Sequence, residues 1–115
     1  MLELSIGRPN HATIVSLKGE FDISEVSRVQ RELRSAEASH PSLVVIDLRE
    51  LTFIDSSGLR LVIEADLRGR SEGRRVVVVP GPEQVHRIFL VALLDKHLEF
   101  VEDPDSLTGP DEARG

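Results

Sequence analysis

Residues 43–59 read LVVIDLRELTFIDSSGL, in which an uninterrupted apolar run leads through a polar segment into the start of a helix. The run Leu43–Ile46 shows no polar alternation, which is typical of a strand covered on both faces. Asp55 is a good N-cap for a helix that opens with residues 56–58. The stretch therefore predicts a buried strand joined directly to a helix, the junction at which open α/β sheets usually carry their function.

Hydrophobic periodicity predicts the other elements. Apolar residues alternate on both sides of the turn signal Pro9-Asn10, which predicts an antiparallel hairpin. The segments that we expect are strands over 2–6, 12–17, 43–46, 76–79 and 98–101, and helices over 26–36, 56–67 and 82–93. Strands joined by helices run parallel with right-handed crossovers. The order predicts an α/β fold, a mixed sheet of about five strands with an antiparallel edge hairpin and roughly three to four helices.

Details of the helices are also predicted. Ser24 or Asp22 is expected to cap the first helix, and the second helix is expected to close near Gly69 or Gly73. The third helix is apolar around more of its circumference than one stripe requires, because Leu90 and Val91 add to it. We expect these two side chains to be buried, with an exposed contact patch as the alternative.

Four arginines gather around the end of the second helix, namely Arg68, Arg70, Arg74 and Arg75. We interpret them as solvated charge that favours the negative end of the helix dipole, with anion or nucleic-acid binding as the alternative. Glu64 and Arg68 have the spacing of an i,i+4 ion pair.

Composition bounds the class of protein. The chain has 115 residues, the size of one domain, with 40% hydrophobic and 30% charged residues, as in soluble globular proteins. Its formal net charge is -6, and most of that lies in residues 102–115, which we expect to form a disordered acidic tail behind a domain over residues 1–101. The remaining charge is nearly balanced, which argues against nucleic acid as a partner.

The compartment is inferred from what the sequence lacks. There is no cysteine, so disulfides and thiolate metal sites are excluded. The longest apolar runs, 76–79 and 90–94, fall far short of the ~20 residues that span a bilayer. Residues 1–5 lack the pattern of a signal peptide, so we expect no membrane association and a cytoplasmic location.

The start of the helix at residue 56 carries two serine hydroxyl groups. Ser56 and Ser57 lie where the backbone N–H groups have no intrahelical partner and the helix dipole is positive, which favours an anion. Phosphorylation there adds about -1.5 to -2 charge, which the helix tolerates but a partner docked over it does not. The same residues also fit a capped turn with no further role, in which Gly58 allows close packing.

A family resemblance favours a phosphorylation switch over a capped turn with no further role. The chain resembles a STAS domain, and specifically the bacterial anti-anti-sigma factors (anti-sigma factor antagonists). The similarity covers residues 1–101 and rests on segments in the family's order: Gly19–Asp22 after the second strand, Val45–Leu48, Leu51–Leu59, Val76–Val79 and the helix led by Pro82. One departure is Leu93, where the family often has glycine before the Leu-Asp pair. We expect a different helix ending there.

The resemblance implies a mechanism of partner switching in transcription regulation. In such phosphoproteins the second serine of the pair, here Ser57, is phosphorylated by a serine kinase that is also the anti-sigma factor. The unphosphorylated domain binds that factor, and a serine phosphatase restores the hydroxyl. The matching Asp22 and Asp55 lie near the acceptor. The docking surface is then expected to comprise Asp22, Asp55, Ser56, Ser57, Gly58 and Leu59, with no cofactor, metal or catalytic residue in this chain.

Other functions fit less well. The serines lack the Gly-x-Ser-x-Gly pattern of a hydrolase. A receiver domain is disfavoured because only Lys18 and Lys96 are available as its distal lysine. The four histidines have no metal-ligand spacing. The alternative that shares the fold is a STAS scaffold subunit of a lipid-transport ATPase or a stress-signalling complex, which is not phosphorylated.

Overall fold

The computed structural model describes residues 1–94 and 96–104. The elements, in chain order, are β1 Leu2–Gly7, β2 Ala12–Phe21, the 3-10 turn η1 Ile23–Glu25, α1 Val26–Glu37, β3 Leu43–Ile54, α2 Ser56–Glu72, β4 Arg75–Val79, α3 Glu83–Val91 and β5 Glu99–Phe100. They form one five-stranded sheet of order β1-β2-β3-β4-β5. β1 pairs antiparallel with β2, and all other pairs are parallel. The predicted mixed sheet with an antiparallel edge hairpin is confirmed.

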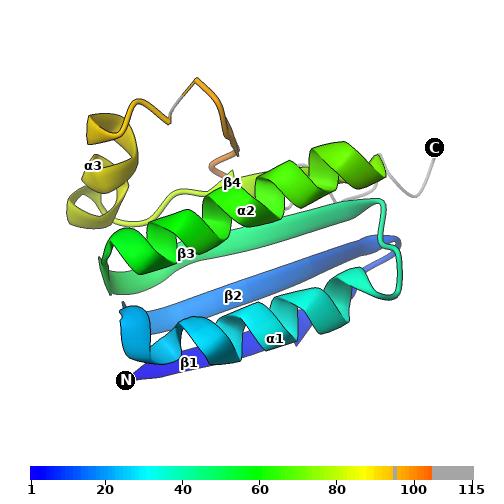
Figure 1. Ribbon diagram of the computed structural model, residues 1–115, viewed down its shortest axis with the longest axis horizontal. Helices are drawn as coiled ribbons and strands as arrows, with labels where there is room; N and C mark the ends of the chain where they lie inside the picture. Colours follow the sequence, from blue (N-terminus) through cyan, green and yellow to red (C-terminus); the bar gives the residue numbers. More distant parts are fainter. Residues whose placement is uncertain (95, 105–115) are drawn as a thin grey trace.

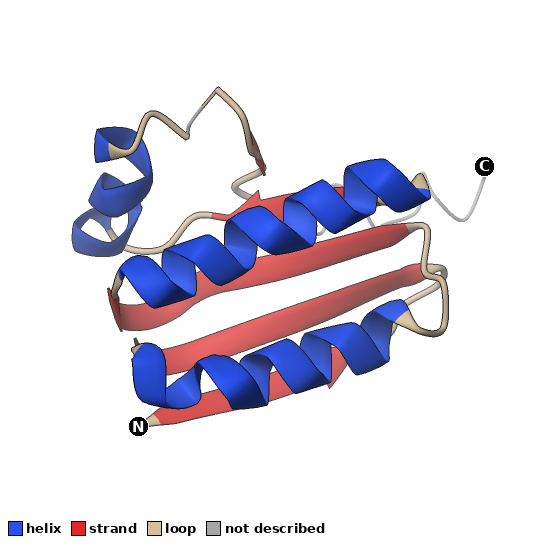
Figure 2. Cartoon of the chain, in the orientation of Figure 1, coloured by secondary structure: helices blue, strands red, loops and turns tan. Residues whose placement is uncertain are grey.

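Two helices cover one face of the sheet. Figure 1 shows α1 and α2 running along the direction of the strands, and Figure 2 shows the same layering of helix over sheet. Both helices bury apolar side chains in the main core against the strands. These side chains are Val29 and Leu33 of α1, and Leu61, Val62 and Ala65 of α2. In both helices the buried apolar residues recur at helical spacing and form the face that packs on the sheet.

The opposite face of the sheet carries a second apolar cluster, made of Ala12, Leu43, Val45, Val77 and Val79. Alternate residues of β3 and β4 thus bury themselves on opposite faces. This explains why both strands read as unbroken apolar runs rather than as alternations.

β2 and β3 are longer than the sequence predicts, since they end at Phe21 and Ile54. The register between them shifts at two irregularities, which interrupts the alternation along β2. Gly19 lies inside β2 rather than after it, and its φ of 108° belongs to the region that favours glycine. A Cβ there would meet the carbonyl oxygen of Met1 at 2.4 Å. The expectation that this segment follows the strand was wrong.

The outer side of α3 is exposed. The helix buries only Val85 and Phe89, whereas Leu90 is 46% and Val91 77% exposed. The prediction that Leu90 and Val91 are buried was wrong, because α3 packs on the core along a single stripe.

α3 ends at Val91, and Leu93, the residue after its C-cap Ala92, has a φ of 60°. The N–H of Leu94 donates to the carbonyl of Phe89 at 2.9 Å, and the N–H of Leu93 donates to that of Leu90 at 3.0 Å. These two bonds form a Schellman motif, in which the left-handed position is usually glycine. Leu93 therefore occupies the left-handed position of this motif, where glycine is usual.

The arginines at the end of α2 are not all solvated. Arg74 is 6% exposed, and Arg68 binds the buried Glu37 of α1 through two hydrogen bonds of 2.8 and 2.9 Å. The interpretation as solvated charge was wrong for these two residues, and Arg68 pairs across to α1 rather than with Glu64. Burial favours the bidentate partner over an exposed pair along the same helix.

The predicted acidic tail begins within the described residues. Residues 102–104 follow β5, and Pro104 is buried. The remainder of that prediction, residues 105–115, lies outside the described residues.

Candidate functional site

The site is built on the cap of α2. Asp55 has extended backbone, and its Oδ1 accepts hydrogen bonds from the N–H of Ser57 at 2.9 Å and from that of Gly58 at 3.1 Å. The carbonyl of Asp55 accepts the first helical bond, from Leu59. The predicted N-cap is confirmed, and the helix begins at Ser56 as expected.

The same bonds change one expectation. The amides of Ser57 and Gly58 were expected to be free for an anion, but the Asp55 carboxylate already occupies both of them. That expectation was wrong because an aspartate N-cap supplies its own anion to the helix start. An added negative group needs a different partner.

Asp55 also ties α2 to the end of β2. Its Oδ2 accepts from the N–H of Ile23 at 3.1 Å, and its own N–H donates to the carbonyl of Phe21 at 3.2 Å. Phe21 and Ile54 are partners in the parallel sheet, so the two chain segments leave neighbouring strands at the same edge. These contacts place η1 beside the first turn of α2.

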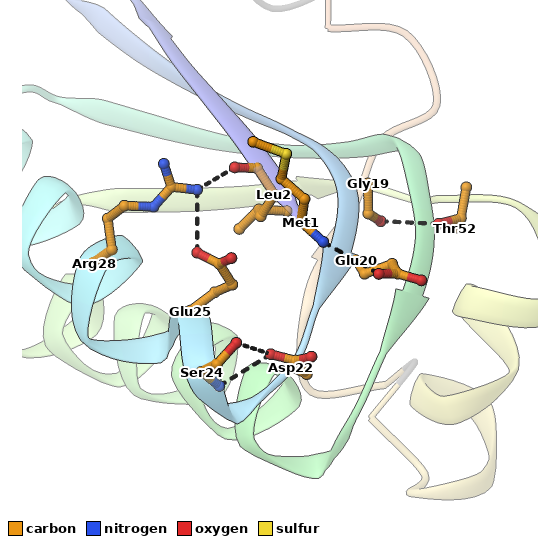
Figure 3. A network of polar contacts seen from close by, with 9 residues as sticks. All are labelled: Met1, Leu2, Gly19, Glu20, Asp22, Ser24, Glu25, Arg28 and Thr52. Atoms are coloured by element: carbon orange, nitrogen blue, oxygen red, sulfur yellow. Dashed lines mark hydrogen bonds and ion pairs between the residues drawn. The ribbon is translucent and has the colours of Figure 1, made fainter.

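Asp22 shapes the loop before η1. Its carboxylate accepts from the hydroxyl of Ser24 and, at 3.0 Å, from the Ser24 N–H (Figure 3). These bonds from Ser24 hold the pKa of Asp22 below its ordinary value. The prediction that Ser24 or Asp22 caps the first helix was wrong for α1, whose N-cap is Glu25 without a capping bond from its side chain. Asp22 instead caps the short η1 turn that precedes α1.

Ser57 lies half-buried in the first turn of α2. It lines a groove of about 280 Å³ between η1–α1 and α2, together with Ile23, Val26, Ser56, Arg60, Leu61 and Glu64. One wall is apolar and the other carries hydroxyls and two charges. A group added to the Ser57 hydroxyl therefore has room beside the helix without entering the core.

Gly58 and Leu59 have structural roles. Gly58 is buried, and a Cβ there would meet the Ile54 side chain at 2.9 Å and the Phe21 ring at 3.1 Å. Leu59 is half-buried and packs against the main core. The helix start sits close to the sheet because residue 58 has no side chain, while contact of these two residues with a partner stays a prediction.

Five groove residues lie outside the docking surface that the sequence predicted, namely Ile23, Val26, Arg60, Leu61 and Glu64. Arg60 and Glu64 follow Ser57 by three and seven residues, so the period of the helix was a signal that could have identified them. Ile23 comes from a distant segment, which the contacts of Asp55 and the pairing of β2 with β3 place beside α2. Within residues 1–94 and 96–104, no cluster of three or more potential ligands could hold a metal ion. No helix in this part of the chain is both long and apolar enough to cross a bilayer.

The chain is similar to known proteins. A family model described as "Mlab, STAS domain" matches residues 4–102. The anti-sigma-F factor antagonist RsfB of Mycobacterium tuberculosis is 24% identical over 108 residues, 94% of this chain and 88% of that protein.

Solved structures share the fold. The crystal structure of an anti-sigma factor antagonist from Mycobacterium paratuberculosis superposes with a TM-score of 0.80 at 22% identity, over 92% of this chain and 90% of the other. The Bacillus cell fate determinant SpoIIAA in its phosphorylated form superposes with a TM-score of 0.71 at 17% identity, over 99% of this chain and 100% of the other. The family match covers most of the chain, and the chain belongs to the STAS domain family.

Proposed function

We propose that this chain is a cytoplasmic anti-sigma factor antagonist, which binds an anti-sigma factor of the serine-kinase type and is switched off by phosphorylation of Ser57. The observation that carries the proposal is the place of Ser57, half-exposed in the first turn of α2 and open to a groove. The names of RsfB and of the Mycobacterium paratuberculosis structure support the class of function. The phosphorylated SpoIIAA structure supports a phosphate on this fold.

The chemistry of the switch belongs to the partners. The kinase supplies ATP and magnesium. A bond forms between Ser57 Oγ and the γ-phosphorus of ATP, while the bond between that phosphorus and the oxygen that leaves with ADP breaks. The hydroxyl proton passes to the kinase or to solvent. A phosphatase hydrolyses the ester and restores the hydroxyl. This chain contributes the acceptor and the docking surface, and it needs no cofactor.

The docking surface in this proposal surrounds the acceptor. Asp22 and Asp55 hold the loop and the helix start in place, and Ser56 lies on the same turn as Ser57. A partner that covers this turn excludes water from the Ser57 hydroxyl. A docked partner must desolvate a dianion there or is repelled by it, and burying such a charge is costly. The phosphate then releases the partner while the fold is unchanged.

Labelling tests the proposal. The chain is incubated with ATP and each kinase-type anti-sigma factor encoded in the same organism, and its intact mass is measured. One added phosphate is expected on the wild type and on Ser56→Ala, and none on Ser57→Ala. Labelling that persists in Ser57→Ala contradicts the assignment of the acceptor.

A second candidate is a STAS scaffold subunit of a lipid-transport ATPase or a stress-signalling complex, which acts without phosphorylation. The description of the matching family model, "Mlab, STAS domain", names no anti-sigma factor and is the observation that favours this candidate. Wild-type protein that no such kinase labels or binds, but that co-purifies with an ATPase, would decide for the scaffold.

A further inference from the structure

The groove beside Ser57 contains one cationic side chain, that of Arg60. Arg60 follows Ser57 by three residues on α2, which places the two side chains on the same helix face. Its side chain is exposed, and among the described residues no carboxylate lies within ion-pair distance of it. By contrast, Arg68 and Arg70 on the same helix are engaged with Glu37 and Asp66.

A phosphate on Ser57 needs such a cation. The amides of Ser57 and Gly58, which would otherwise bind it, donate to Asp55 at 2.9 and 3.1 Å. The Asp55 carboxylate is itself an anion at the helix start, and Glu64 adds a second carboxylate further along the groove. The phosphate therefore meets two like charges and only one opposite charge within this site, the guanidinium of Arg60.

We propose that Arg60 is the receptor for the phosphate of phosphorylated Ser57, forming an i,i+3 ion pair that lies in the groove between η1 and α2. The inference rests on the proposed function, because it requires a phosphate at Ser57. Arginine suits the role, since its planar guanidinium binds phosphate oxygens with two N–H groups at once.

The pair has a consequence for the switch. The phosphate and the guanidinium together occupy the groove that Ile23, Val26 and Leu61 line with apolar groups. Phosphorylation then removes two features from a docking partner, namely the open groove and the free positive charge of Arg60. Arg60 is a positioning residue in this scheme, because it orients the phosphate and does not react.

Phosphorus-31 NMR tests the pair directly. Phosphoserine is incorporated at position 57 during translation, so no kinase is required, and the second ionisation of the phosphate is followed by pH titration. We expect the titration midpoint to lie lower in the wild type than in Arg60→Gln by about 0.3 pH unit, because a nearby cation favours the dianion. Arg60→Lys should retain much of the difference, and raising NaCl from about 0.05 to about 0.5 M should reduce it by screening.

Arg31→Gln is the matched control, since it removes another exposed arginine that does not line the groove. Its midpoint should equal that of the wild type. Equal midpoints for wild type and Arg60→Gln overturn the inference even where a kinase labels Ser57, in which case the proposed function stands. The midpoints of wild type and Arg60→Gln can differ as expected while no kinase labels Ser57. That result rejects the proposed function, and with it the physiological role of the ion pair.

Discussion

The carboxylate of Asp55 accepts a hydrogen bond from the N–H of Ile23, a residue 32 positions earlier in the chain, at 3.1 Å. Its other oxygen caps α2 through Ser57 and Gly58. The Asp55 side chain thus contacts both walls of the groove beside Ser57. Asp55 therefore has a structural role that is measurable independently of any partner.

Asp55→Ala is expected to lower the free energy of unfolding by about 2 kcal/mol, because it removes a helix cap and leaves three N–H groups without their acceptor. Urea denaturation followed by circular dichroism measures this value. Asp55→Asn is the matched control, since its amide oxygen still accepts the capping bonds and most of the stability should remain. An alanine variant as stable as the wild type would show that water replaces the carboxylate at no cost.

Ser57→Asp is expected to weaken binding to the anti-sigma factor about 1000-fold, which corresponds to ~4 kcal/mol, because a protein docked over this turn must desolvate the added charge or is repelled by it. The melting temperature should stay within a few degrees, since Ser57 is half-buried and lines the groove, where an added carboxylate does not enter the core. Calorimetric titration and thermal melts measure the two quantities.

Ser56→Asp provides the comparison for that experiment, because Ser56 is exposed on the same turn. It should weaken binding less than the change at Ser57. Unfolding of Ser57→Asp, rather than loss of binding, would mean that the serine serves the fold.

The sequence predicts local features of this protein better than contacts between distant segments. Asp55 was identifiable as a cap because its bonds to residues 57 and 58 are local. Its bond to Ile23 depends on how β2 and β3 pair, and the bulges that set this register leave no simple periodicity. The burial of Arg74 depends likewise on tertiary packing, since charge alone suggests an exposed residue.

Glu37→Gln is expected to destabilise the fold by about 3 kcal/mol, because it removes the charge that compensates arginines at the junction of α1 and α2. Glu37 is 7% exposed, its Oε1 lies 2.8 Å from Arg68, and Arg74 is within 3.9 Å. Chemical denaturation measures the loss. Glu83→Gln is the control: its side chain is 88% exposed and 3.4 Å from Arg87, so it should change stability by less than about 0.5 kcal/mol.

The pair of Glu99 and Arg75 predicts a dependence on pH. Hydrogen bonds from Arg75 hold the pKa of Glu99 below its ordinary value of 4.5 in the folded chain. Because the folded pKa is the lower one, the pair stabilises the fold above pH 4.5, and this contribution is lost as the pH falls through the folded pKa.

Both side chains of that pair are about half exposed, at 52% and 42%, so solvent screens their interaction. Glu99→Gln should be less stable than the wild type by about 0.5 kcal/mol at neutral pH, and the difference should vanish near pH ~2. Urea midpoints at both pH values measure it. A gap that stays constant with pH would assign the effect to packing instead of charge.

Leu93→Gly is expected to stabilise the protein by about 1 kcal/mol, because a leucine in left-handed conformation pays a steric cost that glycine avoids. Leu93 has a φ of 60° and its side chain is 72% exposed, so little packing is lost with it. Leu90→Gly is the matched control: Leu90 lies inside α3, where glycine should cost about 1 kcal/mol by helix propensity alone. A Schellman ending requires that glycine raise the free energy of unfolding at residue 93 and lower it at residue 90. Loss of stability in both variants would show that the strain at Leu93 is absent in solution.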